Sequence, residues 1–447
     1  MGKLFGTDGV RGVANIELTP ELAYDIGRAG AYILAPEMKG KVLVGKDTRA
    51  SGDMLEAALT AGITSMGIDV VSLGVIPTPA VAYLTRKHNA LAGVVISASH
   101  NPGDYNGIKI FDSKGLKLPD KVEEKIEDII LANKEIKTRP IKNDIGRVYI
   151  DDNGARDYKD FLKDAIKVDL KGMKVALDCG HGALYKIAPE MIEELGGEVI
   201  CVNEDPDGMN INLDCGSTNP DIIKKLVKDN NADIGFSFDG DGDRIIAVDN
   251  EGEIVDGDHI LSICAGYLKE NNRLKNNTVV GTVMTNMGLD IYLEENDMKI
   301  VKTKVGDRYI LEEMLKNDYS IGGEQSGHII FLDYNTTGDG LATGLWLLEV
   351  MKETKRPICE LNRLMKDYPQ VLLNAKVSND RKYSYLDNEE IKNEIDRIEE
   401  FFHGEGRVVI RPSGTEPLVR VMIEGKNQGE ITKIAQELVD FIEERIG

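Results

Sequence analysis

Residues 234–244 read IGFSFDGDGDR. The first five are apolar or small and predict a buried strand, and the next six form a turn that carries three aspartates and an arginine. In open α/β sheets, ligands bind outside the carboxyl ends of the strands. This stretch therefore predicts an α/β fold in which a strand delivers a charged loop to a ligand site.

Three more strand-like runs lead into unusual polar loops. Residues 94–96 (VVI) lead into SASHNP at 97–102, and residues 319–321 (YSI) lead into GGEQSGH at 322–328. Residues 408–410 (VVI) lead into RPSGTEP at 411–417. Together with the aspartate loop, these loops are spread over the whole chain, so they predict one cleft that several domains share.

Strand-like and helix-like stretches alternate along most of the 447 residues, a length too great for a single ordinary core. We predict an α/β protein of four domains around a central cleft: three related mixed α/β domains and a smaller C-terminal α+β domain. The polar, weakly periodic stretch 134–152 is expected to lead from the first domain into the second. The predicted domains cover residues 1–150, 151–251, 252–367 and 368–447.

The net charge is −22, which argues against nucleic acid or an anionic membrane as the partner. A small phosphorylated ligand remains compatible, because local Arg, Lys and helix N-termini bind phosphate even in an acidic protein. No apolar run is long enough to span a membrane and no signal-peptide pattern is present, so we expect a cytoplasmic protein. The five scattered cysteines form no metal-binding spacing and are expected to be reduced thiols.

Asp239, Asp241 and Asp243 alternate with two glycines. Two like charges about 4 Å apart repel by about 4 kcal/mol at an effective dielectric constant of about 20, so converging carboxylates require a cation. Oxygen ligands favour a hard ion such as Mg²⁺, and the glycines let the backbone fold tightly around it. One alternative is an acidic turn exposed to water. An EF-hand fails, because Arg244 and Asn250 stand where that loop needs Gly and Glu.

Ser99 follows a predicted strand and directly precedes His100. A serine at a strand end is by itself most often a turn residue, and its hydroxyl is a poor nucleophile unless it is activated. As a phosphoserine it becomes a phosphoryl donor with three acceptor oxygens, which needs a metal ion and cationic partners. The aspartate loop and the arginine-bearing loops supply both, so we predict that Ser99 carries a phosphoryl group.

Two further loops have the composition of a sugar-phosphate site. The loop at 411–417 offers a guanidinium, two hydroxyls and a glycine that lets backbone amides approach, although an ordinary turn is the alternative. Its candidates, with one residue of the next strand, are Arg411, Ser413, Gly414, Thr415 and Arg420. Glu324, Ser326 and His328 alternate, so in an extended loop they face one side, where they suit sugar hydroxyls.

Taken together, these segments resemble the α-D-phosphohexomutase superfamily over the whole chain and in the order of that family. The resemblance rests on the runs GTDGVRG at 6–12, SASHNP at 97–102, DGDGDR at 239–244, GEQSGH at 323–328 and RPSGTEP at 411–417. Within the superfamily, the chain is most similar to the phosphoglucosamine mutases. The resemblance implies four domains around a central cleft.

The resemblance also assigns roles to particular residues. The implied catalytic residues are Ser99 as phosphoserine, Lys109 as general acid/base, and His100, Arg11 and Arg244 around the phosphoryl group. The implied ligands of Mg²⁺ are the phosphate of Ser99 and the carboxylates of Asp239, Asp241 and Asp243. The implied substrate-binding residues are Asp307, Glu324, Ser326, His328, Arg411, Ser413, Gly414, Thr415 and Arg420.

The activity implied by the resemblance is the interconversion of glucosamine 6-phosphate and glucosamine 1-phosphate, on the route to UDP-N-acetylglucosamine. It runs through a 1,6-bisphosphate intermediate, and a sugar 1,6-bisphosphate is the expected activator. Gln325 and Asp307 favour the glucosamine enzymes, because phosphomannomutase/phosphoglucomutase relatives typically carry Met, and often His, in those segments. An acidic side chain at 307 or 324 suits a cationic 2-amino group.

Three alternatives stay open at this point. One is a phosphomannomutase/phosphoglucomutase or a broad-specificity hexose-phosphate mutase. The second is a metal-dependent phosphatase, and the third is a non-catalytic phosphosugar-binding protein. The expected assembly is a monomer or a homodimer.

Overall fold

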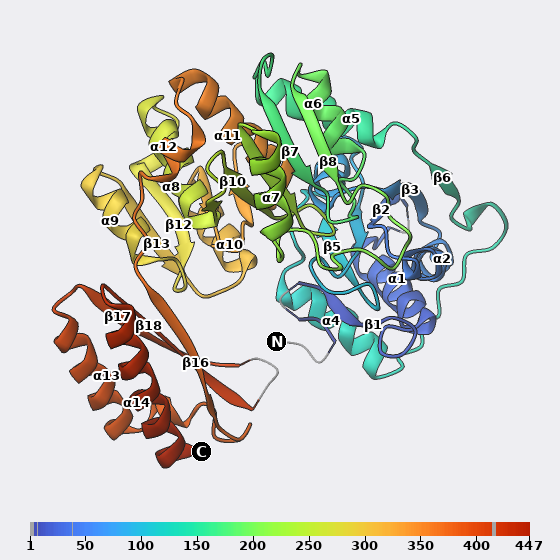
Figure 1. The fold of residues 1–447 in the computed structure, drawn as a ribbon. Helices are drawn as coiled ribbons and strands as arrows, with labels where there is room; N and C mark the ends of the chain where they lie inside the picture. Colours follow the sequence, from blue (N-terminus) through green and yellow to red (C-terminus); the bar gives the residue numbers. More distant parts are fainter. Residues whose placement is uncertain (1–3, 7, 38, 414–416) are drawn as a thin grey trace.

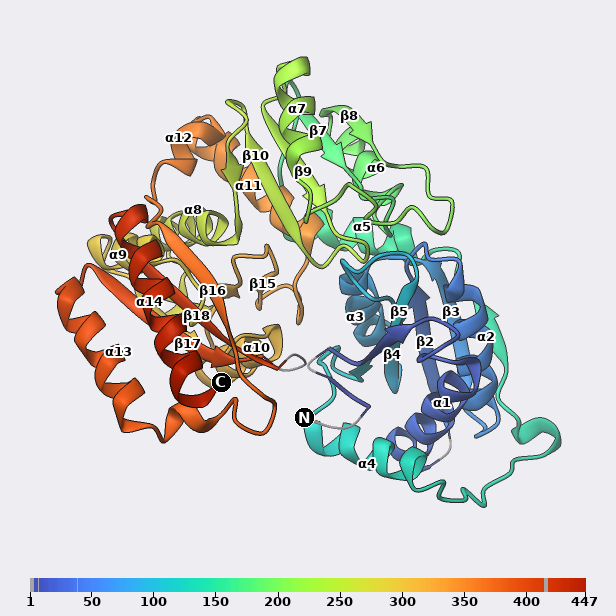
Figure 2. The same cartoon turned by 60° about the horizontal axis from the view of Figure 1, so that its bottom comes forward.

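The computed structural model describes residues 4–6, 8–37, 39–413 and 417–447. Four sheets follow one another along the chain, and Figures 1 and 2 show the four parts arranged in an arc with the C-terminal part facing the N-terminal one. The predicted fold class, three mixed α/β domains and a smaller C-terminal domain, is confirmed. No described helix is long and apolar enough to cross a membrane.

The first sheet has six strands in the order β1-β5-β4-β2-β3-β6. β2, β3, β4 and β6 are parallel, whereas β5 pairs antiparallel with both β4 and β1. The strands are β1 (Val10–Val13), β2 (Lys41–Lys46), β3 (Asp69–Val75), β4 (Ala92–Ile96), β5 (Tyr105–Asp112) and β6 (Val148–Ile150). Their helices are α1 (Pro20–Leu34), α2 (Ser51–Thr64), α3 (Thr78–Lys87), α4 (Asp120–Leu131) and the short η1 (Lys142–Asp144).

The second sheet has the order β11-β10-β9-β7-β8, and its centre is the buried strand predicted from residues 234–238. Its strands are β7 (Lys174–Asp178), β8 (Glu198–Val202), β9 (Ile234–Phe238), β10 (Ile245–Asp249) and β11 (Ile254–Val255). The helices of this part are α5 (Gly154–Ala165), α6 (Ile187–Glu194) and α7 (Asp221–Asn230). The aspartate loop joins β9 to its antiparallel partner β10.

The third sheet has the order β13-β12-β14-β15. Its strands are β12 (Thr278–Thr282), β13 (Lys299–Thr303), β14 (Ile321–Gly323) and β15 (Ile329–Phe331). Its helices are α8 (Gly257–Glu270), η2 (Lys275–Asn277), α9 (Met287–Glu295), α10 (Asp307–Asn317), α11 (Gly340–Thr354) and α12 (Ile358–Asn362). We call everything from β1 to α12 the body.

The C-terminal domain, from β16 to α14, is a three-stranded antiparallel sheet in the order β16-β18-β17 with two long helices on it. Its elements are β16 (Gln370–Lys376), η3 (Ser384–Leu386), α13 (Glu389–Phe402), β17 (Gly406–Pro412), β18 (Leu418–Gly425) and α14 (Gln428–Ile446). α13 and α14 begin at Asn388 and Asn427, whose side chains accept the first free backbone N–H groups.

The apolar cores divide the molecule unequally. One core runs continuously through the body and includes Leu43 of the first part, Phe236 of the second and Trp346 of the third. The C-terminal domain instead buries its own set, including Val421 and Leu438. Burial of apolar surface is the main stabilising term, so the body is welded together while the C-terminal domain is stabilised by itself.

A small polar joint connects the C-terminal domain to the body. The Asn286 side chain donates to Tyr368 O and accepts from Tyr368 N–H, both at 3.0 Å, just before β16 begins. The Arg407 guanidinium donates to Thr285 O and pairs with the buried Glu424. Hydrogen bonds of this kind constrain a connection without adding an apolar core across it.

The stretch 134–152 differs from its prediction. It contains β6, which pairs parallel with β3 and extends the first sheet instead of only leading away from it. Three residues are too few to show strand periodicity, and their exposure gives no alternation of apolar and polar residues. The domain boundaries proposed from the sequence stay a prediction.

Candidate active site

A cavity of about 550 Å³ lies where the four parts meet. It is lined by Leu4, Gly6, Asp8, Gly9, Arg11, His100, Asp243, Arg244, Val305, Gly306, Asp307, Glu324, His328 and Arg411. The C-terminal domain contributes Arg411, and the body contributes the rest. The loops predicted to converge thus reach one cleft.

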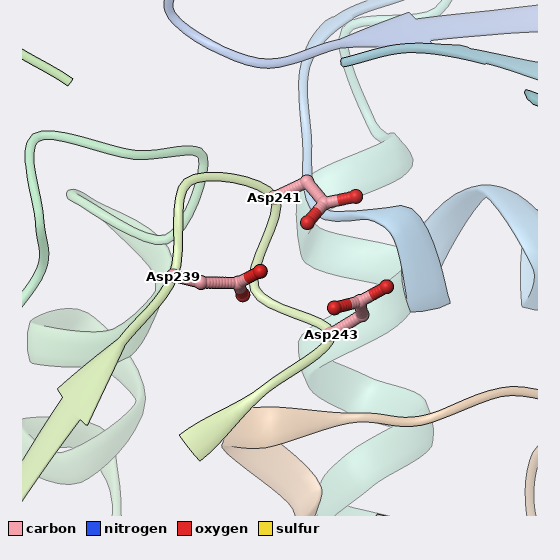
Figure 3. A group of neighbouring side chains, drawn as sticks. All are labelled: Asp239, Asp241 and Asp243. Carbon is pink, nitrogen blue, oxygen red and sulfur yellow. The ribbon is translucent and has the colours of Figure 1, made fainter. Parts of the chain in front are cut away.

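The aspartate loop brings its three carboxylates together (Figure 3). One oxygen each of Asp239, Asp241 and Asp243 lies within 4.8 Å of the other two, and all three residues are buried. The loop passes close to the Ser99 backbone, because a Cβ on Gly240 would lie 2.7 Å from Ser99 O. Only glycine permits this approach, which is the reason that the motif needs it there.

The carboxylates have the properties of a metal site. Asp241 Oδ1 and Asp243 Oδ1 are buried and have no hydrogen-bond partner among the described residues. Burial raises the pKa of Asp239 well above its usual value, and the neighbouring Asp243 and Asp241 add to the effect. Unpaired buried carboxylate oxygens are costly, so these residues fit a hard divalent cation such as Mg²⁺.

Ser99 follows β4 on a strained turn at the base of the same cleft. Its φ is +55°, a conformation that non-glycine residues rarely adopt, and three contacts hold it. Ser97 Oγ accepts the Ser99 N–H at 2.9 Å, while Arg49 Nη2 and Asn212 Nδ2 donate to Ser99 O at 3.2 and 2.9 Å. The turn aims Ser99 Oγ at Asp239 Oδ2, to which it donates at 2.6 Å.

Lys109 reaches the cluster from β5, where it pairs with Val95 of β4. Its Nζ lies 2.8 Å from Asp241 Oδ2, 3.0 Å from Asp8 Oδ2 and 3.5 Å from Asp243 Oδ2. Burial disfavours its charge, but the carboxylates of Asp241, Asp8 and Asp243 outweigh burial and raise the pKa of Lys109 above its usual value. A buried ammonium therefore lies among the acidic groups.

Arg244, His100 and Arg11 surround the Ser99 turn. Arg244 Nη1 lies 3.3 Å from His100 Nδ1, and that nitrogen lies 3.4 Å from Ser99 Oγ. Burial, followed by the cations Arg244 and Arg11, lowers the pKa of His100 to about 4. The imidazole is therefore neutral at neutral pH, and the two guanidiniums supply the positive charge around the turn.

The loop at 322–328 does not have the extended shape expected from its alternation. Gly327 N–H donates to Glu324 O, and Glu324 N–H donates to His328 O, so the chain turns back on itself. Glu324 and His328 line the cavity and His328 is buried, whereas Ser326 is exposed at the tip of the turn. The expectation that all three face one side is wrong, because alternation sets a common face only in extended backbone.

The phosphate loop is brought to the cavity by the β17–β18 hairpin. Arg411 and Arg420 are direct cross-strand partners, and Arg411 lines the cavity. Burial and the like charge of Arg420 lower the pKa of Arg411, and Glu324 partly offsets them. Two adjacent guanidiniums favour an anion between them. Ser413 is buried beside them, and Gly414 and Thr415 lie outside the described residues.

Comparisons with known proteins agree with this geometry. Phosphoglucomutase/phosphomannomutase α/β/α domains I, II and III match residues 2–137, 156–252 and 256–368, and the C-terminal domain of the same family matches residues 372–441. The chain belongs to the phosphoglucomutase/phosphomannomutase family. The resemblance seen in the sequence is confirmed.

Within this family, the chain is similar to proteins named phosphoglucosamine mutase. It is 59% identical to that of Alkaliphilus oremlandii and 59% identical to that of Thermoanaerobacter sp. (strain X514), with 100% of each chain covered. A phosphoglucomutase/phosphomannomutase family protein of Burkholderia thailandensis has the same fold, with a TM-score of 0.82, 24% identity and coverage of 100% and 99%. The N-acetylphosphoglucosamine mutase of Aspergillus fumigatus, in complex with GlcNAc-6P and magnesium, superposes with a TM-score of 0.71, 17% identity and coverage of 99% and 95%.

Sequence reasoning missed two charged residues of this family member's cleft. Asp8 lies in the run at 6–12, of which only Arg11 was selected, and Lys117 lies in no motif. Lys117 Nζ pairs with Asp8 and lies 2.5 Å from Asp307 Oδ2. Burial raises the pKa of Asp307, but Lys117 and His328 outweigh burial and lower it.

These contacts close into a ring in which nitrogen bases and carboxylates alternate. Its members, in order, are Lys109, Asp8, Lys117, Asp307, His328 and Asp243. We call it the charge ring. It joins the first part of the body to the second and third directly beside the cavity.

Proposed function

We propose that this chain is a phosphoglucosamine mutase, an isomerase that interconverts glucosamine 6-phosphate and glucosamine 1-phosphate. One observation carries the proposal. Ser99 Oγ donates to Asp239 in a buried cluster of three carboxylates, at a cavity to which all four parts of the chain contribute. A binding protein needs no strained serine aimed at a metal site, whereas a phosphoryl-transfer enzyme does.

The proposed reaction has two transfers that mirror each other. The bond between phosphorus and Ser99 Oγ breaks, and a bond forms between phosphorus and a hydroxyl of the sugar phosphate, giving the 1,6-bisphosphate. The proton of that hydroxyl ends on Ser99 Oγ. After the intermediate reorients, its other phosphoryl group returns to Ser99 and the isomeric monophosphate leaves. A sugar 1,6-bisphosphate is the proposed activator, because it phosphorylates a free Ser99.

The residues around Ser99 supply positioning and charge, which are the main terms in phosphoryl transfer. Arg244 and Arg11 lie on the cavity side of the turn, and Lys109 lies among the carboxylates. Mg²⁺, held by Asp239, Asp241, Asp243 and the phosphate of Ser99, would neutralise charge on the transferring group. General acid/base catalysis by Lys109 is part of this proposal.

The other end of the substrate is assigned to the second and third loops of the cleft. Arg411 and Arg420, with Ser413, Gly414 and Thr415 next to them in the chain, are proposed to hold the phosphate that does not react. Glu324, His328 and Ser326 are proposed to contact sugar hydroxyls. Because the sugar must bind with either end toward Ser99, a phosphate site on a separate domain suits the reaction.

The assignment to glucosamine rests on the names of the relatives and on Asp307, Gln325 and Glu324. Asp307 is already paired with Lys117, whereas Glu324 Oε1 accepts a backbone N–H from Gly306 at 3.0 Å and lines the cavity. Of the two candidate partners for the 2-amino group, Glu324 is therefore the less neutralised. The cytoplasmic location expected from the sequence stays a prediction.

One assay tests the function. The purified protein is incubated with Mg²⁺, a trace of sugar 1,6-bisphosphate and equal concentrations of glucosamine, glucose or mannose 6-phosphate. The expected result is the highest kcat/KM with glucosamine 6-phosphate and about one phosphate on Ser99 by mass spectrometry. Equal or faster turnover of glucose or mannose 6-phosphate would contradict the glucosamine assignment. Release of inorganic phosphate without a 1-phosphate product would contradict a mutase.

A further inference from the structure

The edge of the first sheet farthest from the cleft carries an unusual concentration of exposed apolar side chains. Five large apolar residues within ten positions are exposed in this part of the described chain: Ile141, Ile145, Val148, Tyr149 and Ile150. Ile150 is 76% exposed, Val148 55% and Tyr149 49%. Contiguous apolar surface of this kind marks an interaction site more often than a solvated one.

These residues include the whole of β6, which is the last strand of its sheet. Figure 1 shows β6 at the rim of the molecule, on the side opposite the C-terminal domain. An edge strand presents unpaired backbone groups, and natural proteins usually protect such edges with charged residues, Pro or a covering element. Val148, Tyr149 and Ile150 offer none of these protections.

The hydrogen-bond phase shows which backbone groups point outward. Val70 N–H donates to Arg147 O, and Asp151 N–H donates to Ser72 O, so residues 147 and 151 direct their backbone groups toward β3. Direction alternates along a strand. Tyr149 therefore also faces β3, whereas Val148 and Ile150 present their N–H and C=O groups at the open edge.

The segment is self-complementary when a second copy is placed antiparallel to it. With the two-fold axis at Tyr149, Val148 lies opposite Ile150 of the other copy, and all their outward N–H and C=O groups form one hydrogen-bonded pair on each side. Arg147 then lies opposite Asp151, in a non-hydrogen-bonded pair whose Cα atoms are about 4.5 Å apart. Opposite charges at this spacing attract.

Charge around the strand also suits a second copy. The chain as a whole carries −22, which repels another copy, but residues 139–152 contain three cationic and three anionic side chains and are locally neutral. A hollow of about 720 Å³, lined in part by Ile145, Arg147 and Tyr149, lies beside the strand. It gives the side chains of the second copy room on that face.

We propose that β6 is a homodimer interface at which two copies of this chain join their first sheets antiparallel about a two-fold axis at Tyr149. The surface consists of β6, its flanking Arg147 and Asp151, and the exposed Ile141 and Ile145. Isologous pairing uses the same patch on both copies and closes the assembly at two. The cleft lies at the opposite end of the sheet order, where β5 and β1 carry Lys109 and Arg11, so both active sites stay open.

The test compares two double variants that have the same number of charged replacements. In Val148→Lys/Ile150→Lys, an ammonium faces an ammonium at both pairs. In Val148→Lys/Ile150→Glu, an ammonium faces a carboxylate at both pairs. Sedimentation velocity and light scattering of the full chain at micromolar concentration give the mass, and the melting temperature reports whether the sheet itself survives.

The wild type is expected to have twice the mass of the 49.2 kDa chain. The Lys/Lys variant is expected to be a monomer, and the Lys/Glu variant a dimer. The expected kcat per chain is equal for all three, because the edge is remote from the cleft. A monomeric wild type would overturn the proposal and leave the edge to some other partner. A Lys/Lys variant that stays dimeric would overturn it as well, by placing the interface elsewhere.

Discussion

The body and the C-terminal domain hold their functional residues in different ways. The three parts of the body share one apolar core and are joined again beside the cavity by the charge ring. The C-terminal domain has its own core and meets the body at a polar joint around Asn286 and Arg407. Groups that must keep a fixed geometry around Ser99 therefore lie on the rigid part, and the Arg411–Arg420 pair lies on the part that is free to reposition.

The largest effect is expected where the rigid part holds the reacting atom. Ser99→Ala should lower turnover more than about 10⁴-fold, because no other group in the cluster accepts the phosphoryl group. The fold should persist, since only the hydrogen bond to Asp239 is lost. A mutase assay and calorimetry of the same preparation measure both. Turnover near the wild-type rate would place the phosphoryl carrier elsewhere.

The next effect concerns the carboxylates that the body positions. Asp241→Asn keeps an acceptor for Lys109 and Thr78 but removes one negative charge from the cluster. Mg²⁺ affinity and kcat should both fall, kcat by about 10²-fold or more. Titration calorimetry with Mg²⁺, followed by activity against metal concentration, is the measurement. Unchanged Mg²⁺ binding would remove this loop from the metal site.

A pH experiment separates the two regions by stability. Burial raises the pKa of Asp339 to about 6, and this carboxyl caps α11 and accepts the Tyr158 hydroxyl. The folded state holds its proton to higher pH than the unfolded state does, so this group lowers stability as pH rises from about 4 to about 6. Asp339→Asn keeps the cap but cannot ionise. It should gain up to about 3 kcal/mol over the wild type across that window.

Calorimetry between pH 4 and pH 7 measures this gain. If the body and the C-terminal domain unfold as separate units, only the transition of the body should move relative to the wild type, since Asp339 lies in the body. Parallel shifts of every transition would show that the two regions unfold together. A gain that grew as the pH fell below 4 would contradict the direction of the pKa shift.

A smaller effect is expected in the C-terminal domain. Arg411→Met removes one guanidinium of the pair that faces the cavity. KM should rise by about 10- to 50-fold, with less change in kcat, because one charged hydrogen-bonding group to the substrate phosphate is lost. The matched control is Arg397→Met on α13, which pairs with Glu394 and does not line the cavity. A fall in kcat with KM unchanged would contradict a binding role.

The smallest effect tests the joint. Asn286→Ala removes the cap of α9 and both bonds to Tyr368, whereas Asn388→Ala removes only the cap of α13. Each lost cap costs about 1 kcal/mol. Only Asn286→Ala should also speed protease cleavage near residue 368 and change KM, by a few fold. Equal cleavage in the two variants would mean that the joint does not restrain the C-terminal domain.

Much of the site could be predicted because its motifs are local. The aspartate loop and the Ser99 turn each lie within six residues of a buried strand, so hydrophobic runs and turn chemistry locate them. Lys117 and Asp8 could not be found in this way. Each is an ordinary charged residue in the sequence, and their pairing with Asp307 exists only once the first and third parts pack together.

The errors have similar physical causes. Alternation of Glu324, Ser326 and His328 predicts a common face only if the backbone is extended, and two backbone hydrogen bonds turn it instead. β6 escaped because three consecutive apolar residues show no period, and its pairing with β3 joins residues almost 80 positions apart. Local patterns located the chemistry, and the long-range contacts that assemble it came only from the packed chain.

The separate core of the C-terminal domain has an evolutionary consequence. A unit that folds around its own apolar residues and is attached by a few polar contacts can be exchanged between related chains as a cassette. A chimera that joins this body to the last domain of another family member would inherit phosphoryl chemistry from one parent and phosphate grip from the other. Substrate range could thus diversify by recombination at residues 366–370 while the Ser99 cluster stays unaltered.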